Sequence, residues 1–416
     1  MKLRSLLPAL AILASIACPG SAQEWPQFLG PNRNGVTTVS NLATSWPKDG
    51  PAVLWRHDVG EGFSGPVIAG GRLVICHRVA DVDEVLCLDP ATGKALWKGG
   101  LPATYRDDFG MEEGPRATPA MADGRVFTFS ADGLAAAWNV TNGAVLWKVD
   151  TRKEYGARKG FFGLAASPLV ENGLVILNVG GRDGAGFVAL DAASGQLRWK
   201  ATGDEASYAS PVAATVAGQR RVFALTREAF VGIDPADGRL LFRHPWRPAM
   251  HASVSAATPL VLGDQLFLSA SYDTGATLLR VGDGKPEVVW ESKDALASHY
   301  STCVEHGGYL YGFDGRADPA LQRASRFRCV DLKTGQVRWT ESSLKSGTVT
   351  RVNDRLLILT EQGELLLAAA TPERFQVAAR AQVLSLGVRA HPAVAQGKLF
   401  ARGKDRLVAV RLTEGQ

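Results

Sequence analysis

The sequence predicts an all-β fold, an eight-bladed β-propeller made of four-stranded antiparallel blades, and three observations support it. A turn signature recurs along the chain: Asp or Asn, Gly four residues later, and Trp or Phe four residues after that. A Ser/Thr-Pro, Gly-Pro or His-Pro pair precedes most copies of the signature. Short apolar and β-branched runs separated by Gly-containing turns lie between the two markers. Four short strands in a unit of about 45 residues are typical of a propeller blade.

Each part of the turn signature has a physical role in such a blade. The Asp or Asn side chain accepts hydrogen bonds from amides of its own turn, and Gly supplies a positive φ. The aromatic residue then falls on the outer strand, where it covers the gap to the next blade. A row of Trp side chains would also suit a sugar or cofactor platform, but one aromatic per repeat in fixed register favours packing between blades. The regular copies are Asp89/Gly93/Trp97, Asn139/Gly143/Trp147, Asp191/Gly195/Trp199, Asp234/Gly238/Phe242 and Asp331/Gly335/Trp339.

Degenerate copies complete the count and predict how the ring closes. The last unit, ending at residues 407–410, has no aromatic outer strand, whereas residues 53–56 carry an unassigned Trp55. Pairing of the N-terminal strand with the C-terminal blade explains both facts and removes exposed sheet edges. Eight blades follow, with seven as the alternative, and residues 51–416 form one domain after a lead-in at 23–50. The inter-blade aromatics are then Trp55, Trp97, Trp147, Trp199, Phe242, Trp290, Trp339 and Phe375.

The N-terminus has the features of an export signal. Lys2 and Arg4 precede a short apolar run, and a small-residue exit predicts a signal peptide at residues 1–22, cleaved after Ala22. Cys18 offers the alternative of a lipoprotein. No later apolar run is long enough to span a membrane. We therefore expect an exported monomer, periplasmic or secreted, with no transmembrane span.

Charge and cysteine content exclude several classes of function. The formal net charge is +5 over the whole chain, with acids and bases interspersed, which gives no indication of nucleic-acid binding. Cys76, Cys87, Cys303 and Cys329 form no CxxC motif, so haem attachment and clustered zinc sites are unsupported.

Cysteine pairing follows from the expected strands. A tight hairpin at Asp81 and Val82 would place Cys76 opposite Cys87, within reach of a disulfide. Cys303 and Cys329 are expected on the first and third strands of a blade, roughly 9–10 Å apart and therefore too far for one.

The repeat also carries a family resemblance. Residues 189–199, Ala-Leu-Asp-x-x-Ser-Gly-x-x-x-Trp, resemble the pyrroloquinoline-quinone (PQQ) repeat of quinoprotein alcohol dehydrogenases and of BamB-type outer-membrane assembly lipoproteins. The lead-in at residues 25–33 resembles the start of secreted bacterial PQQ-like propeller proteins. The resemblance covers nearly all of the mature chain. It implies the fold, but both enzymes and non-catalytic scaffolds share that fold.

Quinoprotein dehydrogenases need features beyond the blades. In that family PQQ lies over the funnel, capped by a disulfide between adjacent cysteines and polarised by Ca²⁺ on Glu, Asn and Asp. This sequence has no adjacent cysteines. The position two residues before each Ser/Thr-Pro pair should line the funnel mouth, and it carries two arginines and no carboxylate, which does not suit Ca²⁺. The ring reads Phe63, Arg116, Ala165, Tyr208, Ala256, Tyr300, Ser346 and Arg389. Nearby loop acids, Glu112, Glu113, Asp204 and Glu205, leave the question open.

We therefore expect no catalytic residue, no metal ligand and no cofactor, with PQQ and calcium as the alternative. The predicted function is a non-catalytic propeller that binds a protein, peptide or glycan partner through its faces and funnel; the alternative is a PQQ-dependent oxidoreductase with a divergent site. A basic, aromatic mouth suits an anionic group, whereas pairing of the same residues with loop acids such as Glu112 would only tie the blades together. In the ligand interpretation, combining Arg116→Ala with Arg389→Ala abolishes binding and leaves the melting temperature nearly unchanged. The candidate ligand residues are Arg116, Tyr208, His251, His299, Tyr300 and Arg389.

Overall fold

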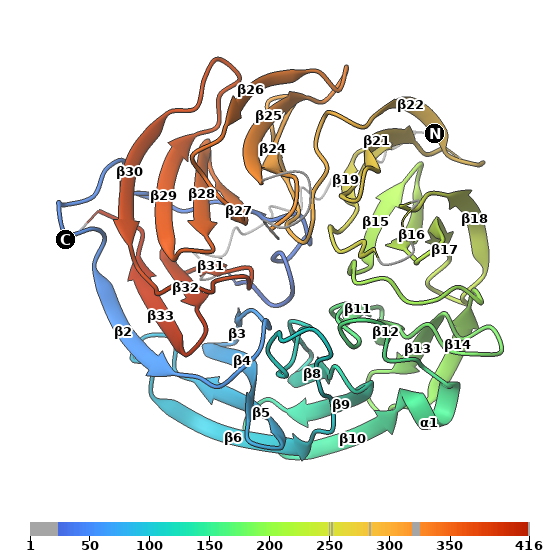
Figure 1. The fold of residues 1–416 in the computed structure, drawn as a ribbon. Coiled ribbons are helices and arrows are strands. Elements are labelled where there is room, and N and C mark those ends of the chain that lie inside the picture. Colours follow the sequence, from blue (N-terminus) through green and yellow to red (C-terminus); the bar gives the residue numbers. More distant parts are fainter. Residues whose placement is uncertain (1–23, 249, 251–252, 283, 318–324, 415–416) are drawn as a thin grey trace, which may run out of the picture.

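Eight sheets, each built on a four-stranded blade, stand around a central axis in the computed structural model, which describes residues 24–248, 250, 253–282, 284–317 and 325–414. Figure 1 shows the sheets as the blades of a closed ring, with the short helix α1 (Thr151–Tyr155) at its rim. The predicted eight-bladed propeller is confirmed. The predicted signal peptide with Cys18, and His251, lie outside the described residues.

Each blade runs from an inner strand near the axis to an outer strand at the wall. The first blade contains β3 (Val67–Ala69), β4 (Arg72–Val79), β5 (Val82–Leu88) and β6 (Ala95–Pro102), and the second contains β7 (Ala120–Ala122), β8 (Arg125–Phe129), β9 (Leu134–Asn139) and β10 (Val145–Asp150). The third contains β11 (Leu169–Glu171), β12 (Leu174–Asn178), β13 (Phe187–Asp191) and β14 (Leu197–Ala201), and the fourth contains β15 (Val212–Val216), β16 (Gln219–Leu225), β17 (Ala229–Ile233) and β18 (Leu240–Pro245). The fifth blade contains β19 (Leu260–Leu262), β20 (Gln265–Ala270), β21 (Gly275–Arg280) and β22 (Glu287–Ser292), and the sixth contains β23 (Val304–His306), β24 (Tyr309–Asp314), β25 (Arg326–Asp331) and β26 (Val337–Glu341). The seventh contains β27 (Gly347–Val352), β28 (Arg355–Thr360), β29 (Glu364–Ala369) and β30 (Val377–Gln382).

The eighth blade joins the two ends of the chain. It contains β31 (Ala393–Ala395), β32 (Lys398–Arg402), β33 (Arg406–Arg411) and, as its outer strand, β2 (Val53–Asp58). β2 pairs antiparallel with β33, with Trp55 opposite Ala409. Figure 1 shows the blue β2 beside the red β33. The predicted closure is therefore confirmed, and it gives the last blade the outer strand that its own unit lacks.

Aromatic side chains connect each outer strand to the next blade. Trp55 donates a hydrogen bond from Nε1 to the carbonyl of Pro90 at 3.2 Å, and its ring covers Gly93. A Cβ on Gly93 would lie 2.6 Å from the indole, and the residue has φ +70°, so only glycine fits. The same arrangement recurs for Trp97 with Val140 and Gly143, Trp147 with Ala192 and Gly195, Trp199 with Pro235 and Gly238, and Trp290 with Leu332 and Gly335.

Three of the expected inter-blade aromatics vary from this arrangement. Trp339 donates to the carbonyl of Thr371, and Phe242 packs on Phe223 and Phe230 of its own blade. Phe375 lies in the turn before β30, against Trp339 of the preceding blade, and not on an outer strand. Ala379 occupies the outer-strand position there. This turn lacks the Asp-x-x-x-Gly signature, so the spacing that located the other aromatics does not apply.

Hydroxyl groups form a second, inner set of contacts between blades, which the repeat pattern did not predict. The Ser or Thr that precedes an inner strand accepts a hydrogen bond from the backbone amide of the equivalent residue on the preceding blade. Proline follows this hydroxyl in three of the four cases and fixes the chain there, so the Ser/Thr-Pro marker serves the inter-blade contact as well as the strand start. The bonds run from Gly65 to Thr118, Thr118 to Ser167, Ser167 to Ser210 and Thr258 to Thr302, all 2.9 or 3.0 Å long.

The lead-in crosses from one side of the ring to the other. β1 (Val36–Thr37) adds to β27 of the seventh blade as a parallel strand, while Trp25 exchanges two 2.8 Å backbone hydrogen bonds with Ile68 of the first. Arg33, 2% exposed, reaches the opposite side of the ring and donates to the carbonyls of Pro168 (2.8 Å) and Ser167 (3.2 Å). Burial lowers the pKa of Arg33 to about 9. The segment therefore connects the first, third and seventh blades across the ring.

His391 is predicted to make the stability of the propeller sensitive to acid. Its ring stacks edge-on against Phe28 of the lead-in at 5.2 Å, and neither nitrogen has a hydrogen-bond partner among the described residues. Burial lowers its pKa from 6.5 to about 4. The unfolded chain therefore binds this proton more readily, so stability falls as the pH drops from about 6.5 to about 4 and levels off below.

The loss expected from this one group is about 3 kcal/mol. Urea unfolding at pH 7 and pH 4.5 measures it. His391→Phe, which cannot bind a proton, should remove that part of the pH dependence. A variant with the same pH slope as the parent would contradict the assignment.

The cysteine register differs from the expectation. Val79 pairs with Val82, so the hairpin turns one residue earlier, at Ala80 (φ +52°) and Asp81. Cys76 then faces Val85, and Cys87 lies two positions away, opposite Val74. The expected register, with Cys76 opposite Cys87, was therefore wrong, and both thiols are free and buried. Cys303 lies immediately before the first strand of its blade, Cys329 lies on the third as expected, and both are free.

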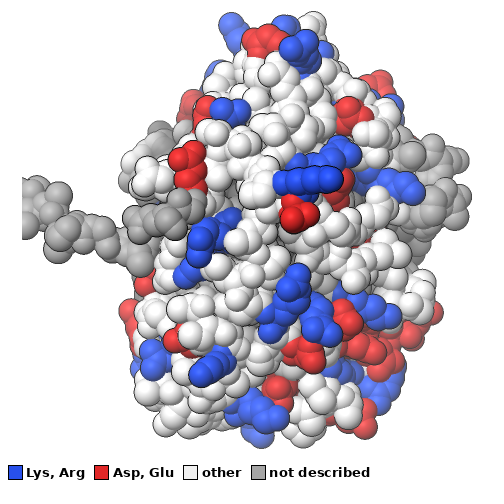
Figure 2. Space-filling view, turned by 90° about the vertical axis from the view of Figure 1, so that its left-hand side faces the viewer, with Lys and Arg blue, Asp and Glu red and all other residues white. Residues whose placement is uncertain are grey.

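Basic and acidic residues are interspersed on the outer wall. Figure 2 shows the side of β2 and β30, where Lys and Arg alternate with Asp and Glu over a largely uncharged surface. Among the described residues, no helix has the length and apolarity to cross a bilayer.

Candidate functional site

The loop between the first two blades, residues 103–117, is tied to the funnel mouth by Arg116. The guanidinium donates to Asp107 Oδ1 at 3.1 Å, to the carbonyl of Glu112 at 2.7 Å and to that of Gly114 at 2.6 Å. Both charged side chains are buried, at 6% and 1% exposed. Burial alone would raise the pKa of Asp107. Hydrogen bonds from the amides of Met111 and Phe109, together with Tyr105 and Arg116, outweigh it and hold the pKa below its usual value.

A second pair holds the far side of the mouth. Arg389, before the eighth blade, donates to Glu361 Oε1 at 2.9 Å, and the Tyr300 hydroxyl donates to the same oxygen at 3.0 Å. Burial, followed by the charge of Glu361, raises the pKa of Tyr300 well above its usual value. Arg116 and Arg389 both approach the ring of Phe63, at 5.7 and 5.9 Å. The structure thus brings four predicted lining positions into one arc, in which each arginine faces a loop carboxylate.

Tyr208 faces a different loop, residues 156–168, between the second and third blades. Its hydroxyl accepts hydrogen bonds from the amides of Phe161 (2.9 Å) and Phe162 (3.1 Å). Burial raises the pKa of Tyr208 in spite of these donors. Helix α1 starts this segment: Asp150 caps it, and Gly156 (φ +67°) ends it. Tyr208 therefore holds the loop in place.

The last described member of the predicted set, His299, lies beside Tyr300. Its ring centroid is 6.0 Å from that of Tyr300, and Nε2 lies 3.2 Å from the Tyr272 hydroxyl. Tyr272 in turn stacks under Arg316 at 4.2 Å. His299 belongs to a cluster of rings between the fifth and sixth blades, apart from Arg116.

Several residues of the mouth were not identified from the sequence. Asp107 and Glu361 are the carboxylates that hold the two arginines, and neither belongs to a repeat motif. Phe109 is 55% exposed, and its ring lies 6.1 Å from that of Phe161 and 5.0 Å from that of Phe162. The sequence signal for Phe109, Phe161 and Phe162 was their position inside glycine-containing loops, outside any alternating strand pattern.

The donor set at the mouth does not fit a calcium–PQQ site. Asp107 and Glu361 each face a guanidinium, and Glu112 Oε2 accepts a hydrogen bond from the Gly62 amide. Calcium needs several oxygen ligands with no competing cation beside them. No three His, Cys, Asp or Glu side chains gather as a metal site within the described ranges. We derive no chemical step through that cofactor.

Because Arg116 and Asp107 are both buried, we expect Arg116→Ala to destabilise the protein. This differs from the nearly unchanged melting temperature that the sequence predicted for the combination of Arg116→Ala and Arg389→Ala. Arg116→Ala leaves the Asp107 carboxylate buried without its cation, so we expect a cost of about 3–5 kcal/mol, expressed as opening of residues 103–117. Hydrogen exchange of the Phe109 and Met111 amides measures it. Arg389→Ala, at a side chain that is 32% exposed, should cost about 1 kcal/mol or less. Combining Arg116→Ala with Asp107→Ala should restore much of the protection, and slow exchange in the single variant would contradict the argument.

The sequence is similar to that of outer-membrane assembly factors and, over part of its length, to that of quinone-dependent dehydrogenases. A family model described as outer membrane protein assembly factor BamB matches residues 43–160 and 84–341. The assembly factor BamB of Shewanella oneidensis is 23% identical over 408 residues, which cover 89% of this chain and 91% of that protein. The dehydrogenase subunit of the quinone-dependent alcohol dehydrogenase of Gluconacetobacter polyoxogenes is 28% identical over 173 residues, 39% of this chain. That match spans only 22% of the dehydrogenase subunit's length.

Solved structures show the same fold. BamB from Moraxella catarrhalis superimposes with a TM-score of 0.62 at 14% identity, covering 88% of this chain and 98% of that one. The quinohemoprotein alcohol dehydrogenase from Comamonas testosteroni superimposes with a TM-score of 0.66 at 13% identity, covering 95% and 81%. At these identities the likeness concerns the fold alone.

Proposed function

Because this chain belongs to the PQQ-repeat propeller family whose model is described as outer membrane protein assembly factor BamB, we propose that it is a non-catalytic binding protein of the cell envelope. The relative that aligns along almost its whole length is an assembly factor, whereas the dehydrogenase match covers about a fifth of the enzyme. The proposed partner is a protein or peptide held at the funnel mouth and the two loops beside it. A signal peptide cleaved after Ala22 would deliver the chain there.

One observation supports the proposal most directly. The charged groups at the funnel mouth form ion pairs with one another, whereas the aromatic ring of Phe109 beside them is exposed to solvent. Arg116 and Arg389 are engaged by Asp107 and Glu361, so neither pair is poised for proton transfer. Phe109, by contrast, extends from its loop with more than half of its surface exposed, next to the rings of the neighbouring loop. Exposed aromatic clusters are typical of surfaces that bind proteins.

Crosslinking tests where a partner binds. A photoreactive amino acid at Phe109 or Leu386, both exposed on mouth loops, should give one discrete adduct in envelope membranes. The same group at Leu197, 41% exposed on outer strand β14, is the matched control and should give none. Equal labelling from the wall, or no adduct from the mouth, would count against the proposal.

The 28% identity to the dehydrogenase subunit of a quinone-dependent alcohol dehydrogenase over 173 residues favours a second candidate, a PQQ-dependent oxidoreductase. Purified protein mixed with PQQ and Ca²⁺ would then reduce a dye in the presence of alcohols or sugars. Binding of the cofactor with substrate-dependent turnover would replace the binding-protein proposal; absence of both leaves it standing.

A further inference from the structure

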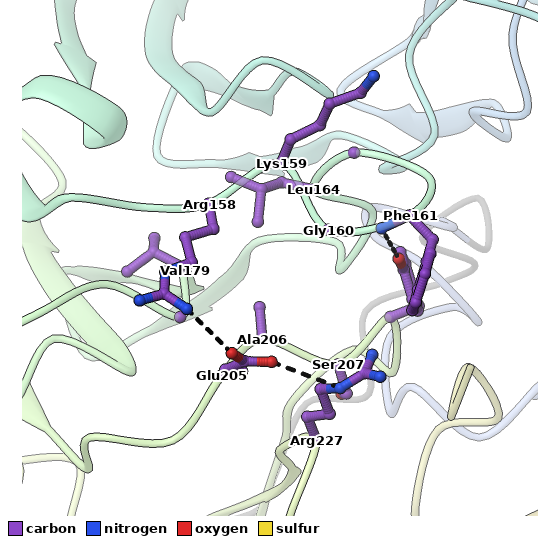
Figure 3. A pocket seen from close by; sticks show the side chains of 13 residues that line it. Arg158, Lys159, Gly160, Phe161, Leu164, Val179, Glu205, Ala206, Ser207 and Arg227 are labelled. Carbon is purple, nitrogen blue, oxygen red and sulfur yellow. Dashed lines mark hydrogen bonds and ion pairs between the residues drawn. The ribbon is translucent and has the colours of Figure 1, made fainter. Parts of the chain in front are cut away.

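A pocket opens beside the funnel mouth, between the loop at residues 156–168 and the fourth blade. Its volume is about 270 Å³. Leu164 and Val179, which are buried, form its apolar floor with Ala206, and Phe161 forms one wall. Figure 3 shows these side chains around the opening. The pocket is large enough for one apolar side chain, and Ser207 and Tyr208 also line it.

Basic side chains surround this floor. Arg158 and Arg227 approach Glu205 from two sides, at 3.2 and 3.4 Å, one on each carboxylate oxygen, so a single acid serves two guanidinium groups (Figure 3). Arg227 also stacks on Phe161 at 5.2 Å, which fixes the aromatic wall. Lys159 extends away from the pocket and pairs with Asp108 at 2.7 Å.

The positive side continues outward from the pocket. A neighbouring hollow of about 810 Å³ shares Arg158 and Lys159 with the pocket and adds Arg152, Lys153 and Arg182. Asp132 and Asp150 are the acids of this hollow; they lie 3.9 Å from Arg152 and 3.5 Å from Lys153. Arg182 is exposed and forms no ion pair within the described ranges. Leaving Lys159 aside, five cations face three carboxylates along the two hollows.

We propose that the pocket and the adjoining hollow bind an extended acidic peptide segment, with one apolar side chain on the Leu164–Val179 floor and flanking carboxylates on Arg158 and Arg182. This inference rests on the proposed function and specifies the chemistry of the partner. An excess of guanidinium groups favours carboxylates, which arginine holds through paired, charge-assisted hydrogen bonds. The apolar floor of Leu164, Val179 and Ala206 favours an apolar amino-acid side chain over a sugar, whose hydroxyl groups would lose their bound water against it.

Fluorescence anisotropy with labelled peptides tests the inference on the full mature chain. The probe is a short peptide of Asp and Glu residues with a central Leu. One comparison peptide replaces Leu with Ser, and another replaces the acids with Asn and Gln. We expect binding of the first alone, weakened by salt, and at least about tenfold weaker in the Arg158→Ser/Arg182→Ser variant.

Arg239→Ser is the matched control. Arg239 is 63% exposed and pairs with Asp234 at 3.1 Å, much as Arg158 is 65% exposed and pairs with Glu205, but it lies in the outer turn of the fourth blade. It should leave the affinity unchanged. Equal binding of the Leu and Ser peptides, an equal effect of Arg239→Ser, or preference for an acidic polysaccharide such as polygalacturonate would overturn the inference. If the Phe109 crosslink forms while these peptides fail to bind, the inference is wrong and the proposed function stands; if both fail, both are wrong.

Discussion

Gly93→Ala is expected to destabilise the propeller by about 2 kcal/mol more than Gly124→Ala, although the two glycines share nearly the same backbone conformation. Their φ values are +70° and +71°. Both substitutions carry the strain of placing alanine in the left-handed region, about 1–2 kcal/mol. At Gly93 the new methyl group would also lie 2.6 Å from the Trp55 indole, whereas nothing lies within 4 Å at Gly124. Overpacking of this kind costs about 1–3 kcal/mol.

Chemical denaturation of the two variants separates strain from packing. Gly143→Ala, where the methyl group would meet Trp97, should behave like Gly93→Ala. Equal unfolding midpoints for Gly93→Ala and Gly124→Ala would mean that the indole moves aside at no cost, and that the contact between blades contributes little to stability.

Deleting residues 24–58 should have the largest effect of any change considered, because it removes both the lead-in and β2. The free outer edge of β33 would then be exposed, and the buried Trp25 and Trp55 would be lost. Loss of one large buried aromatic costs about 3–5 kcal/mol, against a total stability of about 5–15 kcal/mol for a typical domain. We expect the shortened chain to aggregate or to lack a cooperative thermal transition.

Two companion experiments distinguish closure from a general effect of truncation. Deleting residues 24–43 alone keeps β2 and should give a folded protein with a lower melting temperature. Supplying residues 24–58 as a separate peptide should restore the transition of the longer deletion. A chain lacking 24–58 that melts cooperatively at the parent's temperature would refute the role of the closing strand.

The ring could be predicted because its signals are local and repeated. The turn signature encodes a capped turn, a glycine and an aromatic within one short segment, and five units of the chain carry it in regular form. The missing aromatic after residue 410 and the surplus Trp55 were enough to predict closure. The same method failed where a unit departs from the signature: Phe375 lies in a turn because no Asp-x-x-x-Gly precedes β30. The cysteine hairpin shifted because Ala80 adopts a positive φ that nothing in its residue type announces.

The mouth could be predicted only in part. The register before each inner strand placed Phe63, Arg116 and Arg389 near one another, as their contacts show. Their partners could not be inferred, because Asp107 and Glu361 come from loops whose paths depend on packing far away in the sequence. Tyr208 was assigned to the same ring of residues, but its hydroxyl is taken up by the amides of a neighbouring loop.

The union of β2 with β33 also has a consequence for biogenesis. Residues 53–58 emerge early from any machine that makes or moves the chain from its N-terminus, yet their partner strand ends only at Arg411. The lead-in also docks late, because β1 and Arg33 bind blades on opposite sides of the ring. Until then the nascent array keeps two bare β edges, so this interval is when a chaperone would have to act and when a stalled or clipped chain would be most exposed to proteases.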